Sequence, residues 1–151
     1  MAPYIFLDAG PLGLACKGDH NPKAIQCRSW VEGLREKGYI VLISEVSDYE
    51  VRREFIRIQA WDMIAKLDAL SATSLLRITR PAMLKAAEFW SLLRNQGMST
   101  ADDKELDCDA ILAAQAVTAA QPGDTIIIAT DNIGHLNRFP GVTARPWEYI
   151  S

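Results

Sequence analysis

The sequence contains few of the residues that build covalent frameworks or soft-metal sites. Its 151 residues include three cysteines and two histidines. Cys16, Cys27 and Cys108 form neither an even set nor a Cys-x-x-Cys pair, which argues against disulfides and structural zinc. His20 and His135 have no Ser/His/Asp grouping around them, so we do not expect histidine-based catalysis. This cysteine usage predicts a reducing, cytoplasmic location.

Long hydrophobic runs and an excess of basic residues are also absent. The longest apolar runs, such as residues 39–43 and 125–129, fall far short of the roughly 18 residues that a membrane span needs. No basic-then-apolar leader opens the chain, so we expect neither export nor a membrane location. The formal charge is −3, whereas most nucleic-acid binders have an excess of lysine and arginine. Any nucleic-acid role must therefore depend on local positive patches or on a bound metal.

What is present is the composition of one folded domain. A length of 151 residues lies within the roughly 100–200 residues of a typical domain. The fractions of apolar residues (49%) and charged residues (23%) are ordinary globular values. We therefore expect residues 1–151 to form a single domain.

Strand and helix patterns alternate along the chain. Strands are predicted at residues 4–8, 39–43, 75–78, 125–129 and 142–144, and prolines on both sides make the last one an edge strand. Helices are predicted after Asn21-Pro22, after Ser44 as an N-cap, and at residues 61–70, 81–97 and 105–120. Ala9-Gly10-Pro11 is typical of a turn, and residues 98–104 of a polar loop. This order predicts an α/β fold with a mostly parallel central sheet covered on both faces.

Carboxylates from distant parts of the chain are predicted to meet at one edge of this sheet. Asp8 and Asp131 each end a strand, and Glu50 follows the second strand. Asp107 and Asp109 are expected in the first turn of the alanine-rich helix. In open α/β sheets, ligands bind at the carboxyl ends of the strands. Carboxylates that converge there repel one another unless a cation neutralises them, and oxygen ligands favour Mg²⁺ or Mn²⁺. Such a metal can activate water and stabilise charge on a phosphodiester, which is the chemistry of a nuclease.

Each acid also has an ordinary structural role open to it. Asp8 can form a turn, and Asp107 or Asp109 can favour the positive end of a helix. Glu50 has two rivals on its own helix, Glu45 and Glu54. The sequence pattern does not choose among them.

The basic residues near these acids are open to two interpretations. Glu54 can pair with Arg53 or Arg57 on the helix surface. Together with Arg52 these arginines form a basic strip beside Glu50, and Arg138 and Arg145 follow Asp131. The arginines can position phosphates or can be solvated surface charge.

The motifs that contain the acids resemble the PIN domain of VapC-type toxins. They are Phe6-Leu-Asp8-Ala-Gly-Pro-Leu, Ile43-Ser44 with Glu50 six positions later, Asp109-Ala-Ile-Leu-Ala-Ala114, Ala129-Thr-Asp-Asn-Ile-Gly-His-Leu136, Phe139-Pro-Gly-Val and Pro146-Trp147. The first four are in the order of the family, and together the motifs span nearly the entire chain. No single motif is specific, whereas the ordered set is.

The resemblance implies a PIN-like three-layer α/β/α domain and a metal-dependent endoribonuclease that hydrolyses RNA phosphodiester bonds. It also implies the toxin of a type II toxin–antitoxin pair, with a cognate antitoxin whose tail occupies the acidic groove, and a homodimer. The family's first three acids match Asp8, Glu50 and Asp109. The fourth matches Asp131 or Asn132, and we favour Asp131 because of its charge. The Mg²⁺ or Mn²⁺ ligands implied are Asp8, Asp109 and Asp131, with Asp107 as an added ligand.

Other functions fit the sequence less well. A haloacid-dehalogenase-like phosphatase needs a second Asp where this chain has Gly10, and a receiver domain needs Lys where Thr130-Asp131 stands. The main alternative is a catalytically inactive PIN module that binds RNA or a protein partner, although the presence of all four acids argues against it. The sequence does not separate RNA from DNA substrates, because that choice depends on contacts to the 2′-hydroxyl.

Overall fold

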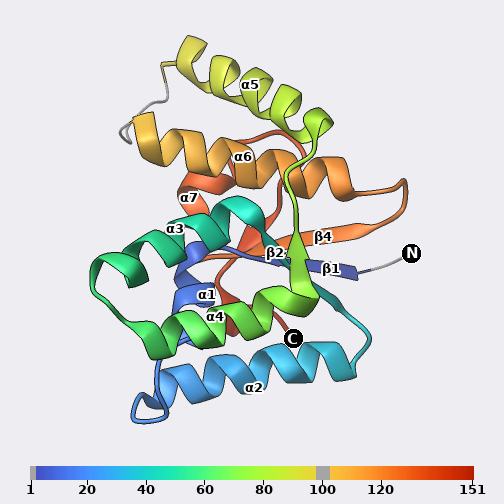
Figure 1. The fold of residues 1–151 in the computed structure, drawn as a ribbon. Helices are drawn as coiled ribbons and strands as arrows, with labels where there is room; N and C mark the ends of the chain where they lie inside the picture. Colours follow the sequence, from blue (N-terminus) through green and yellow to red (C-terminus); the bar gives the residue numbers. More distant parts are fainter. Residues whose placement is uncertain (1–2, 98–102) are drawn as a thin grey trace.

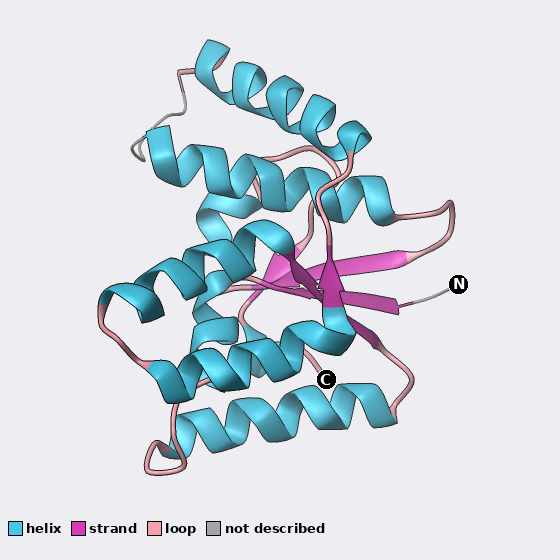
Figure 2. Cartoon of the chain, in the orientation of Figure 1, coloured by secondary structure: helices cyan, strands magenta, loops and turns pink. Residues whose placement is uncertain are grey.

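Five parallel strands form the centre of the molecule (Figures 1 and 2). The computed structural model describes residues 3–97 and 103–151. The strands are β1 (Pro3–Leu7), β2 (Ile40–Ser44), β3 (Leu75–Leu76), β4 (Thr125–Ala129) and β5 (Ala144–Arg145). They are hydrogen-bonded in the order β3-β2-β1-β4-β5, and every neighbouring pair is parallel. The predicted parallel sheet is confirmed, with β5 at an edge as expected.

Helices connect the strands and cover both faces of the sheet (Figure 1). They are α1 (Ala9–Ala15), α2 (Pro22–Glu36), α3 (Glu45–Arg57), α4 (Trp61–Ser74), α5 (Arg80–Asn95), α6 (Asp103–Ala119), α7 (Ile133–Leu136) and the 3-10 helix η1 (Trp147–Tyr149). Helices α1, α2 and α4 pack on one face, and α5 and α6 pack on the other. This arrangement confirms the predicted three-layer α/β/α fold. Within the described ranges, no helix is both long and apolar enough to span a membrane.

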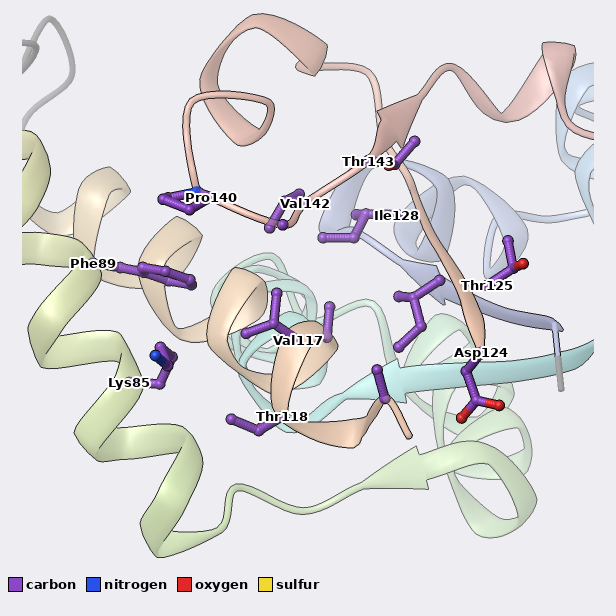
Figure 3. Close-up of a pocket in the computed structure, with 14 residues that line it drawn as sticks. Lys85, Phe89, Val117, Thr118, Asp124, Thr125, Ile128, Pro140, Val142 and Thr143 are labelled. Atoms are coloured by element: carbon purple, nitrogen blue, oxygen red, sulfur yellow. The ribbon is translucent and has the colours of Figure 1, made fainter. Parts of the chain in front are cut away.

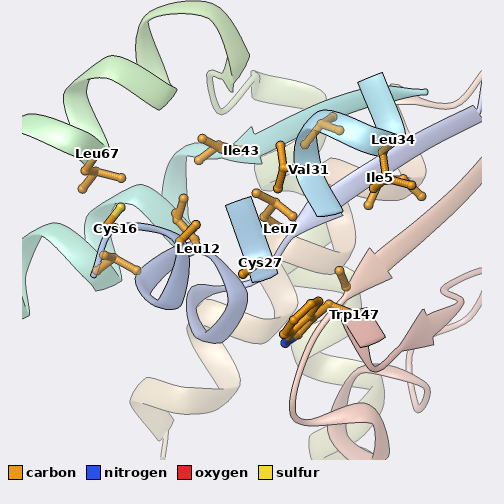
Figure 4. Packing of buried hydrophobic residues seen from close by; sticks show 14 of the residues in the cluster. Ile5, Leu7, Leu12, Cys16, Cys27, Val31, Leu34, Ile43, Leu67 and Trp147 are labelled. Carbon is orange, nitrogen blue, oxygen red and sulfur yellow. The ribbon is translucent and has the colours of Figure 1, made fainter. Parts of the chain in front are cut away.

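Alternate side chains of the central strand enter two hydrophobic clusters, one on each face. Ile5 and Leu7 of β1 lie in the cluster of Figure 4, together with Leu12 of α1 and Val31 of α2. Phe6 points to the opposite face, into the cluster formed with α5 and α6. Because successive strand residues face opposite sides, a continuous apolar strand is buried on both. Each fully buried side chain of this size contributes about 1.5–3 kcal/mol, so the two clusters fix the position of the strand that ends at Asp8.

Capping residues set the ends of several helices where the sequence predicts them. The Asn21 side chain accepts a hydrogen bond from the Ala24 N–H at 3.2 Å, and Pro22 is the first residue of α2. Gly38 and Gly97 follow α2 and α5 with φ of +90° and +67°, a region that favours glycine. These boundaries of α2 and α5 are confirmed.

Near the sheet edge, one local prediction is wrong and another holds with a different hydrogen bond. Ala9-Gly10-Pro11 forms the first helical turn of α1 and not the non-helical turn that was predicted. Proline is tolerated there because the backbone N–H that it lacks would have no partner inside the helix. Ser44 is at the N-cap position of α3, but its hydroxyl makes no capping hydrogen bond. It donates instead to Gln115 Oε1 at 2.6 Å, and the Gln115 amide donates to the Leu76 carbonyl at 2.9 Å. This buried chain of hydrogen bonds connects β2, α6 and β3.

The start of α6 also differs from the prediction. The helix begins at Asp103 rather than Glu105, so Asp107 and Asp109 lie in its second turn and not in its first. Residues 98–102 of the predicted loop lie outside the described residues. The favourable interaction with the positive helix end is strongest in the first turn, so it does not account for Asp109.

Candidate functional site

Asp8 lies at the point where β1 becomes α1, and both of its carboxylate oxygens are held. Oδ1 accepts from the Ala9 N–H at 2.8 Å, and Oδ2 accepts from the Thr130 hydroxyl at 2.7 Å. Burial raises the pKa of Asp8, and the nearby Asp131 charge adds to this rise, while the two hydrogen bonds oppose it. The carboxylate is therefore fixed in direction but electrostatically unfavourable.

Thr130 is a site residue that the sequence motifs did not single out. It is fully buried after β4, and its hydroxyl also accepts a hydrogen bond from the Asn132 N–H at 2.8 Å. The Thr130 hydroxyl thus connects Asp8, which follows β1, to the turn that follows the neighbouring strand β4. The only sequence signal was its place between a strand and Asp131.

Glu50 of α3 and Asp109 of α6 share an electrostatic environment with Asp8. Burial, followed by repulsion from Asp8, raises the pKa of Glu50 to about 7. The pKa of Asp109 is also raised to about 7, by burial and then by repulsion from Asp8 and Glu50. Asp109 Oδ2 is buried and accepts no hydrogen bond from the described residues, and His135 Nδ1 lies 3.8 Å from it. The structure therefore places three of the predicted acids, from three distant segments, within range of mutual electrostatic repulsion.

Asp131 and Asn132 lie on different sides of the turn after β4. The Asp131 carboxylate lies over Gly10 of α1, so closely that a Cβ at residue 10 would overlap Oδ2. Its charge also raises the pKa of Asp8. The Asn132 amide nitrogen lies 2.9 Å from His135 Nδ1, on the side of Asp109. Asp131 is therefore the neighbour of Asp8, and its role as fourth site residue stays a prediction.

The rivals of Glu50 on α3 have other partners. Glu45 Oε1 accepts a hydrogen bond from the Ile78 N–H at 2.9 Å and so anchors the segment after β3. Glu54 forms an exposed ion pair with Arg57, which was one of the two pairings expected for it. Glu50 is the acid of α3 that interacts with Asp8.

Asp107 is placed apart from this cluster. It is exposed and lines two surface pockets together with Ile111. Residues two positions apart in a helix point roughly 200° apart around its axis, so Asp107 and Asp109 face different sides of α6. The α6 acid whose charge acts on both Glu50 and Asp109 is Glu105, one turn before Asp109. The i, i+4 spacing from Glu105 to Asp109 was the sequence signal that could have found it.

The predicted basic strip is used in several ways. Arg52 donates two hydrogen bonds to Asp48, at 2.8 and 3.1 Å, and one to Asp68 at 2.7 Å, and so joins α3 to α4. Arg53 lies over the Tyr49 ring. The charge of Arg138 opposes the rise in the pKa of Asp109 without cancelling it. Arg53 and Arg138 are thus arginines whose charges act on the acids, Arg53 on Glu50 and Arg138 on Asp109.

The donor set suits a hard divalent cation. Asp8, Glu50, Asp109 and Asp131 supply only carboxylate oxygens, the ligands that Mg²⁺ and Mn²⁺ prefer. In the described part of the chain, no three Asp, Glu, His or Cys side chains already form a metal-binding group. A cation between the acids would give the buried Asp109 Oδ2 a partner and would relieve the repulsion that raises the pKa of Glu50 and Asp109. The residues fit the metal in the chemistry of their donor atoms.

A cavity on another side of the described structure is separate from the acids. It has a volume of about 740 Å³ and lies between α5, α6, the start of β4 and the segment 140–143 (Figure 3). Thr125 at its rim is the first residue of β4, whereas the acids follow the last residues of β1 and β4. This cavity is therefore not part of the acidic site.

Comparison with known proteins shows the fold. No family model matches the sequence, and no curated protein matches it significantly. Among solved structures, the chain is similar to one in VapBC2 from Rickettsia felis bound to a promoter DNA fragment, with a TM-score of 0.71 and 16% identity over 95% of this chain and 98% of that one. VapBC-1 from nontypeable Haemophilus influenzae gives a TM-score of 0.69 and 14% identity, covering 96% and 98%. FitAcB from Neisseria gonorrhoeae gives 0.68 and 17%, covering 97% and 99%. The PIN-like fold expected from the sequence motifs is thus matched over nearly the whole chain.

Proposed function

We propose that this protein is a metal-dependent endoribonuclease of the VapC-type PIN group, which hydrolyses RNA phosphodiester bonds. The observation that supports this most strongly is the meeting of Asp8, Glu50 and Asp109, whose mutual repulsion helps to raise the pKa of the last two to about 7. Acids with purely structural roles would be expected near basic partners rather than near each other. The fold likeness to chains of VapBC structures supports the same assignment.

In this proposal Asp8, Asp109 and Asp131 hold Mg²⁺ or Mn²⁺. When bound, the cation lowers the pKa of water and neutralises charge on the phosphodiester. Thr130 holds Asp8 Oδ2 in one direction, which keeps this ligand in place. Glu50, whose pKa is raised chiefly by burial, is suited to accept a proton from water. In place of Asp107, the sequence-based prediction for an added ligand, we propose Glu105, whose charge acts on both Glu50 and Asp109.

The proposal extends to partners. The similar structures are of VapBC and FitAcB, and we propose by analogy that a cognate antitoxin binds this chain and covers the acidic groove. We also propose a homodimer and a cytoplasmic location. RNA as the substrate class follows from the proposed family.

The test is a cleavage assay with purified protein freed of any bound antitoxin. A pool of random-sequence RNA and a pool of single-stranded DNA of equal length are incubated with Mg²⁺, Mn²⁺ or a chelator. We expect the RNA to be cut with either metal and not with chelator, and the rate to fall by roughly 10²–10³-fold in Asp8→Asn. Glu54→Gln, an exposed acid paired with Arg57, is the matched control and should retain full activity.

Two results would contradict the proposal. RNA binding without cleavage under any metal would identify an inactive module. Preferential cutting of DNA would overturn the substrate class.

A further inference from the structure

A second pocket, of about 590 Å³, adjoins the acidic site between α3 and α6. Its lining includes Val46, Tyr49, Arg53, Ile78, Asp107 and Ile111. Cys108 belongs to the same lining, and its thiol is close enough to the Glu50 carboxylate to oppose the rise in the pKa of Glu50. The pocket and the proposed catalytic acids are therefore separated by a single layer of side chains.

An exposed aromatic ring and an arginine stand at this pocket. Tyr49 directly precedes Glu50, and its side chain is 55% exposed. The Arg53 guanidinium lies 5.0 Å from the centroid of the Tyr49 ring, one helical turn further along α3. Arg52 and Arg57 on the same helix have carboxylate partners, whereas Arg53 takes part in none of the ion pairs formed by the described residues. Its charge acts on Glu50, and because Arg53 is exposed its guanidinium can also meet a ligand from solvent.

We infer that this pocket binds the nucleotide next to the scissile phosphate of a single-stranded RNA, with its base stacked on Tyr49 and its phosphate in contact with Arg53. Aromatic rings that lie open to solvent are the usual platform for bases of single strands, and arginine is the usual contact for phosphates. The inference rests on the proposed function, because it names how that site would hold its substrate.

The charges within the pocket favour a base over a phosphate inside it. Asp107 and Glu45 line the pocket and would repel a phosphate, whereas the apolar walls from Val46, Ile78 and Ile111 suit a neutral ring. A carboxylate such as Asp107 can also accept a hydrogen bond from the amino group of a base. Arg53, three positions after Glu50 on α3, is the basic residue of the lining and therefore the group that would contact a phosphate. In a chain with a net charge of −3, such a local cation is what RNA binding requires.

The test measures RNA binding separately from cleavage. A fluorescein-labelled pool of random-sequence 20-nucleotide RNA is titrated with full-length protein in Ca²⁺, and binding is followed by fluorescence anisotropy. We expect Tyr49→Ala and Arg53→Gln each to weaken binding by roughly tenfold, and Tyr49→Phe to retain it. Arg53→Gln should also reduce the salt dependence of binding by about one phosphate contact. Arg57→Gln, on the same helix but paired with Glu54, is the matched control.

Further measurements distinguish a nucleotide-binding pocket from a structural or protein-binding surface. Melting temperature and Mn²⁺ affinity should be unchanged in Tyr49→Ala and Arg53→Gln. Unchanged RNA affinity in both variants, with wild-type RNA cleavage intact, would overturn the inference alone. A change in oligomeric state without a change in RNA affinity would assign the surface to a protein partner and would also overturn it. Absence of both RNA binding and RNA cleavage in the wild type would overturn the proposed function as well.

Discussion

The Asp8 side chain serves the fold and the candidate site at once. It follows the last residue of β1, accepts a hydrogen bond from the first backbone N–H of α1, and accepts another from the Thr130 hydroxyl. The position of Asp8 at a strand end could be predicted from the apolar run before it. Its hydrogen bond with Thr130, 122 residues away in sequence, could not, because no local pattern encodes that contact.

Gly10, a residue beside the candidate site, gives a first prediction. Its missing side chain leaves the space that the Asp131 carboxylate occupies. In Gly10→Ala the new methyl group would displace this carboxylate from Asp8, so we expect Mn²⁺ affinity to fall by roughly tenfold. Stability should not fall, because the end of a flexible side chain moves easily and alanine favours a helix by about 1 kcal/mol over glycine. Calorimetric Mn²⁺ titration and thermal melting measure the two effects.

Gly13→Ala is the matched control for this variant. Gly13 lies in the same helix, and a Cβ there would meet Val51 at 3.8 Å, an ordinary contact. We expect Gly13→Ala to melt at a slightly higher temperature and to bind Mn²⁺ like the wild type. Equal Mn²⁺ affinity in both variants would show that Asp131 over Gly10 has no part in metal binding.

Helix α6 shows which part of the site could not be predicted from the sequence. Its alanine-rich pattern predicts the helix, and the family motif selects Asp109. Whether Asp107 or Glu105 accompanies Asp109 depends on the side of the helix that packs on the sheet. Leu106, Ala110 and Ala113 are buried, which places Glu105 with Asp109 and leaves Asp107 at the surface. Once the buried face of α6 is known, it shows which of these acids lie on the same side of the helix as Asp109.

Helix α1 was missed for a different reason. Gly10 and Pro11 disfavour a helix interior, and the prediction of a turn applied that rule to them. Both residues lie in the first turn of a seven-residue helix, where the rule against proline does not apply. The short α7 similarly offers too few residues for a periodic pattern.

The connection between α3 and α4 gives a prediction at the scale of elements. Asp48 on α3 accepts two hydrogen bonds from Arg52 and one, at 2.6 Å, from the Ser71 hydroxyl of α4. Its side chain is 13% exposed. Asp48→Ala leaves these donors without their acceptor, so we expect a loss of about 1–3 kcal/mol in the free energy of unfolding, measured by urea titration.

Glu54→Ala is the control for the α3–α4 connection. Glu54 pairs with Arg57 on the exposed surface of the same helix, where an ion pair contributes little. We expect its unfolding midpoint to match that of the wild type. An equal effect of Asp48→Ala and Glu54→Ala would show that the buried network does not stabilise the packing of α3 on α4.

At the scale of the whole molecule, parallel topology explains why distant acids meet. The order β3-β2-β1-β4-β5 places the ends of β1 and β4 side by side, with Asp8 and Asp131 just beyond them. Alternating strand and helix patterns predicted this class of sheet. The order of the strands depends on tertiary packing, and so the set of neighbours around Asp8 required the structure.

The same convergence predicts how stability depends on pH. Glu50 and Asp109 have pKa values raised to about 7 in the folded protein, against roughly 4 in an unfolded chain. Between these values the folded state binds more protons, so the free energy of unfolding must fall as pH rises from about 4 to 7. We expect metal-free protein to melt at a higher temperature at pH 5 than at pH 8.

Variants and metal test the origin of this pH dependence. Glu50→Gln should flatten the change of melting temperature with pH, whereas Glu54→Gln should not. Saturating Mn²⁺ should also flatten it, because the cation favours the ionised carboxylates. An unchanged slope in Glu50→Gln would contradict the raised pKa of Glu50.

The proposed function requires that Asp8, Asp109 and Asp131 together bind a divalent metal at the sheet edge. The measurement that tests it most directly is calorimetric titration of Mn²⁺ into the wild type and into single Asp→Asn variants at positions 8, 107, 109 and 131. We expect saturable binding to the wild type, a loss of at least tenfold in affinity at positions 8, 109 and 131, and wild-type affinity in Asp107→Asn. Saturable binding that survives in Asp8→Asn and Asp109→Asn, or no binding to the wild type, would contradict it.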